Sequence, residues 1–151
     1  DLGGEYSLSV GDQRHRAVFN GIYQVGYGFQ VSGLYFYGSG QRYATTWGGD
    51  LRGIGAQAGG SARLRPNGTI VPRNNFVGKP IHRVDVRLQR EFKIAGRVRG
   101  TGLVEVFNLL NHTNYGSYAT AESLVNYGKP AANSSVANTH PAMQLGFRFL
   151  F

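Results

Sequence analysis

The sequence predicts an all-β fold built from antiparallel hairpins, and three observations carry that prediction. Five segments, residues 14–25, 29–43, 82–94, 97–111 and 142–151, alternate apolar and polar side chains with a period of two, as strands do between two different environments. Two of the breaks between these segments are short and contain glycine, as tight hairpin turns do. The third observation is the composition, in which 23 of 151 residues are Gly, 13% are aromatic and only 16% are charged. Such a composition favours strands and turns over helices.

The first predicted hairpin comprises residues 14–25 and 29–43, joined by the tight turn Gly26-Tyr27-Gly28. Alternate residues of both strands are mostly apolar, while Asn20, Gln24 and Gln30 belong to the opposite side. We expect the apolar side to face lipid or a protein partner. Its candidate contact residues are Phe19, Tyr23, Phe29, Val31 and Tyr35.

The second predicted hairpin comprises residues 82–94 and 97–111, with a short turn at Ala95-Gly96. The alternation in its first strand is nearly complete, and only Arg90 interrupts the apolar side. The candidate lipid- or partner-facing residues are Val84, Val86, Leu88, Val104 and Val106. The opposite side has the polar character of a barrel lumen and carries Arg83, Asp85, Arg87, Glu91, Lys93, Arg97, Arg99 and Glu105.

The last predicted strand, residues 142–151, ends the sequence on an aromatic residue. One side of it carries four apolar residues that we take as a candidate interface: Leu145, Phe147, Phe149 and Phe151. Residues 1–11 are a further candidate strand, so the predicted total is five to six strands.

Two long stretches, about residues 48–80 and 113–141, separate the predicted hairpins and are rich in Gly, Ser, Asn and Pro. Loops beyond about 12–15 residues are uncommon in compact soluble domains. Transmembrane β-barrels, in contrast, combine short turns at one end of the barrel with long loops at the other. The sequence therefore predicts a single β domain over residues 1–151, with the strands of a transmembrane-type barrel that is incomplete and has open edges.

The charge and residue content exclude several classes of protein. The formal net charge of +8, from 16 Lys and Arg against 8 Asp and Glu, favours acidic partners. Without Cys the chain forms no disulfide and no thiolate metal site. It contains no apolar run of about 18 residues, as a membrane-spanning helix requires. The sequence begins at Asp1 without a signal-peptide pattern, and we interpret it as a processed product or a piece of a longer protein.

Four short motifs carry a resemblance to a known family. They are Asp-Gln-Arg-His-Arg at 12–16, Tyr-Gly-Ser-Gly-Gln-Arg-Tyr at 37–43, Val-Glu-Val-Phe-Asn-Leu-Leu-Asn-His-Thr-Asn-Tyr at 104–115, and Leu-Gly-Phe-Arg-Phe-Leu-Phe at 145–151. Together they resemble the C-terminal end of a TonB-dependent outer-membrane receptor, of the branch that bears a carboxypeptidase-regulatory-like domain. The final motif is similar to the β-signal that the barrel-assembly machinery reads. The resemblance covers roughly residues 12–151.

This resemblance implies a place in the outer membrane of a Gram-negative bacterium, in a barrel of about 22 strands with a plug in its lumen. The implied activity is TonB-energised solute uptake, and the implied partners are the rest of the barrel, the plug, TonB and outer-membrane lipid. Five or six strands form only part of such a wall, and open sheet edges pair readily with other strands. We therefore expect the isolated chain to assemble with copies of itself into an oligomer or an extracellular filament. The alternative is an ordinary wall segment of an intact transporter.

We expect neither an enzyme nor a cofactor or metal site. His15, His82, His112 and His140 match no metal-binding spacing, and no pair among the eight acidic residues is singled out for acid–base chemistry. The glycine-rich stretch 53–58 nominally fits a dinucleotide fingerprint, but no helical pattern follows it.

Nucleic-acid binding is a more remote alternative for a basic, aromatic β protein. Sheets that bind single strands stack bases on aromatic side chains beside cationic ones. Here the aromatic residues fall mainly on the faces opposite the arginines, so we expect no nucleic-acid partner.

Overall fold

The computed structural model describes residues 4–53, 55, 61–131 and 140–151, and it is all-β, as predicted. It divides into two compact units. The loop unit comprises Asp1–Arg14, Ser39–Pro80 and Tyr115–Ser135, and the sheet unit comprises His15–Gly38, Ile81–Asn114 and Val136–Phe151. Among the described residues, no helix is long and apolar enough to cross a membrane. A single domain over residues 1–151 stays a prediction.

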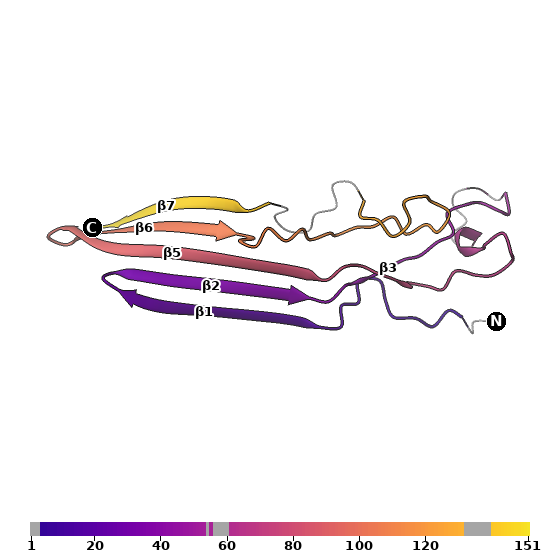
Figure 1. Ribbon diagram of the computed structural model, residues 1–151, viewed down its shortest axis with the longest axis horizontal. Coiled ribbons are helices and arrows are strands. Elements are labelled where there is room, and N and C mark those ends of the chain that lie inside the picture. Colours follow the sequence, from indigo (N-terminus) through magenta and orange to yellow (C-terminus); the bar gives the residue numbers. More distant parts are fainter. Residues whose placement is uncertain (1–3, 54, 56–60, 132–139) are drawn as a thin grey trace. The chain divides into compact units, whose positions relative to one another are not determined.

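The sheet unit is one antiparallel sheet of five strands in the order β1-β2-β5-β6-β7 (Figure 1). The strands are β1 (Arg16–Gly26), β2 (Phe29–Gly38), β5 (Ile81–Ala95), β6 (Val98–Phe107) and β7 (Ala142–Leu150). Each corresponds to one of the five predicted segments, so their number and type are confirmed. The sheet does not close into a barrel, because β1 and β7 are its two edges.

Short turns connect the strands at one end of the sheet, as predicted. In the turn between β1 and β2, Gly26 and Gly28 have φ of 101° and 82°, which favour glycine. A Cβ on Gly28 would lie 2.4 Å from the Glu91 carbonyl oxygen, so the turn has no room for a side chain at this position. The turn between β5 and β6 uses Gly96 with φ of 54°. The connections 39–80 and 108–141 both leave from the opposite end of the sheet.

Two predicted strands end earlier than expected. The second stops at Gly38, and Arg42–Tyr43 instead forms β3, which pairs with β4 (Phe76–Val77) in a separate two-stranded sheet. A Cβ on Gly40 would lie 1.8 Å from the Gly78 carbonyl oxygen, so the backbones of these two segments approach each other closely there. The fourth strand stops at Phe107, because Asn108 and Asn111 turn the chain with φ of 51° each.

The prediction of a strand within residues 1–11 is wrong for the part of that segment that the structure describes. Residues 4–11 contain no strand, and their backbone forms only single hydrogen bonds instead of a ladder. The Gly11 N–H donates to the Arg42 carbonyl at 2.8 Å, and the Arg42 N–H donates to the Asp12 carbonyl at 3.1 Å. Gly11 itself has φ of 82°, which breaks an extended strand.

The loop unit has a small aromatic core of its own. Tyr118 is 8% exposed and packs against Tyr43 and Phe76, with ring centroids 5.2 and 5.1 Å away. Burial raises the pKa of the Tyr43 phenol. Val71 is fully buried, and one 3-10 turn, η1 (Ser61–Arg63), lies in the same unit. The stretches predicted as long loops therefore contain packed structure.

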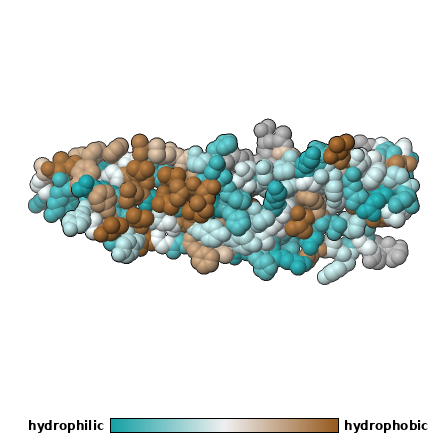
Figure 2. All heavy atoms as spheres, in the orientation of Figure 1, coloured by the Kyte–Doolittle hydropathy of each residue, from teal (hydrophilic) through white to brown (hydrophobic). Residues whose placement is uncertain are grey.

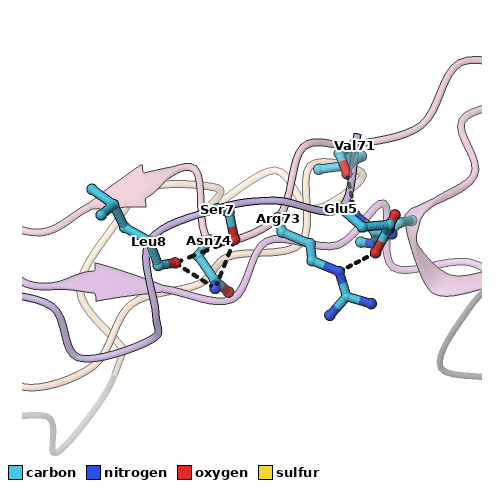
Figure 3. A network of polar contacts seen from close by, with 7 residues as sticks. Glu5, Ser7, Leu8, Val71, Arg73 and Asn74 are labelled. Carbon is cyan, nitrogen blue, oxygen red and sulfur yellow. Dashed lines mark hydrogen bonds and ion pairs between the residues drawn. The ribbon is translucent and has the colours of Figure 1, made fainter. Parts of the chain in front are cut away.

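Ion pairs and hydrogen bonds hold the first described residues to residues 63–74 within this unit (Figure 3). Glu5 accepts hydrogen bonds from Arg63 and Arg73, and these guanidinium groups hold the pKa of its carboxyl below the ordinary value. The Asn74 amide donates to the Leu8 carbonyl at 2.8 Å. A third ion pair of this unit joins Arg65 and Glu122 at 2.6 Å, and the Arg65 guanidinium lowers the pKa of the Glu122 carboxyl.

Gly100 tests how tightly the sheet is packed at its turn end. The Phe92 ring lies over it from the neighbouring strand, and a Cβ at Gly100 would come within 2.6 Å of that ring. We expect Gly100→Val to displace the Phe92 ring and to destabilise the sheet by about 1 kcal/mol, the lower end of the cost of overpacking, because that ring is partly exposed and can move. Gly21→Val is the matched control, because nothing lies within 4 Å of its Cβ position. Urea unfolding followed by circular dichroism measures both, and equal midpoints would contradict the prediction.

Candidate functional site

Within the described residues of the sheet unit, the five strands form a single layer. The buried apolar residues in the described part of the chain, Val71 and Tyr118, both belong to the loop unit. In the sheet unit even large side chains are exposed, with Phe19 at 65% and Phe147 at 74%. Figure 2 shows hydrophobic side chains gathered over the strands of the sheet. Contiguous exposed apolar surface of this kind marks interaction sites in proteins.

The strand register places the predicted apolar residues on one face, which we call the apolar face. Two adjacent rows across the sheet form its centre and are largely aliphatic. One row is Gly21, Gly33, Val86, Val106 and Met143. The next is Tyr23, Val31, Leu88, Val104 and Leu145. The first row lacks side chains at Gly21 and Gly33, but the second row carries an apolar side chain on every strand, so the apolar face is continuous across the sheet.

Aromatic residues flank this aliphatic centre on both sides. Toward the turns, the apolar face carries Phe29, Phe92, Phe147 and Phe149. Toward the other end it carries Phe19, Tyr35, Tyr37 and His82. Phe19 and Tyr35 stack with centroids 6.3 Å apart. Phe151 follows β7 and is 96% exposed.

Arg90, the one charged residue that interrupts the apolar side of β5, lies among the aromatic residues near the turns. Its guanidinium stacks over the Phe29 ring, 4.7 Å from the centroid. Such a cation–π contact places the alkyl part of the side chain along an apolar surface while its charge stays near the end of the sheet.

The opposite side of β5 and β6 is the polar face. It carries seven of the eight predicted residues: Arg83, Asp85, Arg87, Glu91, Lys93, Arg99 and Glu105. Arg83 pairs with Asp85 at 2.6 Å, and Arg99 with Glu91 at 3.2 Å. The eighth residue, Arg97, lies in the turn after β5, where the strand register assigns it to neither face.

The polar face is less polar over β1 and β2 than the sequence suggested. Val18, Ile22, Leu34 and Phe36 lie on it, between the expected polar residues. The Arg16 guanidinium covers the Phe36 ring at 5.0 Å. The sequence of β2 already indicated this, because its even-numbered side begins with the polar Gln30 and Ser32 but continues with the apolar Leu34 and Phe36.

Two asparagines of the 104–115 motif form side-chain hydrogen bonds to the backbone near the end of β6 and the start of β5. Both Asn108 and Asn114 are fully buried. The Asn108 carboxamide accepts from the His112 N–H and donates to the His112 carbonyl, each at 3.1 Å. The Asn114 carboxamide pairs in the same way with the N–H and carbonyl of His82, at 2.9 and 2.8 Å. The motif therefore has a structural role, which spacing alone did not indicate.

The same motif brings His82 and His112 together, with ring centroids 5.0 Å apart. Among the described residues, no group of three or more His, Cys, Asp or Glu side chains is placed to hold a metal ion. The glycine-rich stretch 53–58 falls mostly outside the described residues, so its structure does not bear on the dinucleotide fingerprint.

No protein-family model, curated protein or solved structure matches this chain. The geometry alone defines the site as an open, single-layer antiparallel sheet with one continuous apolar face, one largely polar face and two exposed edges.

Proposed function

We propose that the five-stranded sheet is a wall segment of a transmembrane β-barrel in the outer membrane of a Gram-negative bacterium. In this proposal the apolar face contacts lipid and the polar face lines the lumen. The continuous, exposed apolar face on a one-layer sheet is the observation that carries it. A soluble domain would cover such a face with a second layer, as sheet packing requires.

The strand lengths support this proposal. A transmembrane β-strand needs about 9–11 residues when tilted by about 45°. β1, β2, β6 and β7 have 11, 10, 10 and 9 residues. Only β5, with 15 residues, is longer, and its last residues extend into the short turn.

The order of side chains along the apolar face also supports a lipid contact. Lipid-facing barrel surfaces have an aliphatic band flanked by aromatic girdles at both interfaces. The rows through Val86 and Leu88 supply the aliphatic band, and aromatic residues lie beyond it toward both ends. The opposite face carries the charged residues that a water-filled or plugged lumen accommodates.

The two sheet edges define the partners that the proposal requires. Lipid cannot satisfy unpaired backbone groups, so β1 and β7 must each pair with a further strand in the membrane. The resemblance of the 104–115 and 145–151 motifs to TonB-dependent receptors favours a receptor barrel, with a plug and TonB as further partners. The role of the whole barrel would then be energised uptake of a solute.

The second candidate is assembly of copies of this chain into a soluble oligomer or filament. It rests on the two edge strands, which pair on one side only in the part of the chain that the structure describes. In such an assembly protein, and not lipid, would cover the apolar face. The two candidate functions therefore differ in whether lipid or protein contacts the residues of the apolar face.

A spin-label scan along β7 tests the proposal. Single labels at 143, 144, 145, 147, 148 and 149, in protein refolded into lipid vesicles, report access to oxygen from lipid and to a nickel chelate from water. Position 146 is omitted because a side chain there would press on Leu103, 3.1 Å away. We expect oxygen access at the odd positions and chelate access at the even ones. Odd positions shielded from both reagents would support the self-assembled form, and the absence of a period of two would contradict both candidates.

A further inference from the structure

His82 and His112 come from segments that are distant in sequence, and the fold places them against each other. His82 lies at the start of β5, and His112 lies after β6. Their rings meet edge to face, with centroids 5.0 Å apart. Both line one cavity of about 440 Å³, together with Tyr35, Val84 and Leu110. Two imidazoles on a shared cavity are a candidate pair of metal ligands.

Asn114 determines which nitrogen of His112 carries the proton. Its carboxamide oxygen accepts from the His82 N–H, and its nitrogen donates to the His82 carbonyl, so the opposite orientation of the amide would break both bonds. The His112 Nδ1 lies 3.0 Å from that same oxygen and must donate to it. A neutral His112 therefore has its free lone pair on Nε2, the state in which imidazole binds a metal.

Tyr35 contacts the Nδ1 atom of His82, as Asn114 contacts that of His112. Its hydroxyl lies 2.9 Å from His82 Nδ1 and can act as donor or acceptor by rotation of its proton. When the hydroxyl accepts, His82 also carries its proton on Nδ1 and has Nε2 free. Histidine ligands in metal sites are held in this way, with the second ring nitrogen donating to a neighbouring oxygen.

Neighbouring residues fix the positions of the two histidines and neutralise the nearby positive charge that would repel a cation. Asn108 and Asn114 are fully buried and pair with the backbone of His112 and His82, so both positions are anchored. Arg83 also lines the cavity, but its guanidinium is paired with Asp85 at 2.6 Å.

We propose that His82 and His112 bind a zinc ion through their Nε2 atoms. Zinc suits imidazole ligands and a four-coordinate site, in which water or an added ligand would take the other two positions. Asn114 and Tyr35 are positioning residues, because each holds the second nitrogen of a ligand. His82 and Tyr35 lie on the apolar face at the end away from the short turns, but the proposal does not depend on whether lipid or protein covers that face, and it does not rest on the proposed function.

Calorimetric titration with zinc sulfate, on the full chain refolded in detergent, tests the site. We expect one saturable zinc per chain, weakened at least tenfold by His82→Gln or His112→Gln. Tyr35→Phe removes only the contact to Nδ1 and should weaken binding by about tenfold, as changes behind a metal ligand do. The double variant His15→Gln/His140→Gln is the matched control, because it removes the other two histidines and should bind as the wild type does.

X-ray absorption spectroscopy of the zinc-loaded control variant identifies the zinc ligands directly. Because this variant keeps His82 and His112, the measurement does not depend on substitutions at the site that could impair folding. We expect two imidazole nitrogens at about 2.0–2.1 Å from zinc in that variant. The proposal is overturned if the wild type binds no zinc, if the control variant loses binding, or if its zinc has fewer than two imidazole ligands.

Discussion

Leu88→Arg is expected to destabilise the sheet in a lipid bilayer by about 2–4 kcal/mol, the cost of a cation at the bilayer midplane on a barrel's lipid face. Leu88 lies on the central strand β5, in the aliphatic row of the apolar face, between Val31 and Val104. A charged side chain at this depth has no nearby water to reach. The measurement is urea titration of the protein folded in vesicles, with the folded fraction of the sheet followed by far-ultraviolet circular dichroism.

Gln89→Arg is the matched control for this prediction. Gln89 is the next residue of β5 and lies on the polar face, opposite Gln30 and Leu103. An arginine there would face the lumen, so we expect a change within about 0.5 kcal/mol, as for surface substitutions. Equal effects of the two substitutions would show that the faces do not meet different environments, and the barrel proposal would fail.

Asn114→Ala is expected to cost about 2–3 kcal/mol of folding stability. The substitution leaves the N–H and the carbonyl of His82 without their partner, and each unsatisfied backbone group costs about 1–3 kcal/mol when shielded from water. His82 is only half-buried, so water recovers part of that cost. Urea unfolding gives the change in stability, and amide hydrogen exchange should be accelerated at His82.

Two further variants separate the contributions of Asn114. Asn114→Asp keeps an oxygen for the His82 N–H but loses the donor to the His82 carbonyl, and we expect a smaller loss than for Ala. Asn126→Ala changes an exposed asparagine and should leave stability within about 0.5 kcal/mol of the wild type. If His82 exchange were unchanged in Asn114→Ala, the side-chain pairing would not hold this strand end.

The alternation of side chains was sufficient to predict the faces of β5, β6 and β7. Each step along a strand reverses the side on which the residue lies, so Val84, Val86 and Leu88 had to share one face once the segment was extended. Alternation was less informative for β1 and β2, where Val18 and Phe36 place apolar side chains on the polar face as well. Gly21 and Gly33 carry no side chain and add nothing to either pattern.

The sequence alone could not reveal contacts between segments far apart in the chain. Tyr43, Phe76 and Tyr118 form the core of the loop unit. Phe76 and Tyr118 stand in stretches without periodicity, and Tyr43 was predicted to end a strand of the main sheet. The pairing of His82 with His112 likewise depends on the register of β5 and on the turn after Phe107. Spacing rules apply to ligands on one local element, so they did not detect this pair.

By itself the sequence determined an all-β fold, five strands, their tight turns and most of their two faces, because these depend on the backbone period and on local turn chemistry. Only the tertiary structure decided the strand order, the packing within the loop unit, and the side-chain pairing by Asn108 and Asn114. Those features depend on hydrogen bonds and contacts between distant residues, and the residue types involved are equally common in ordinary loops.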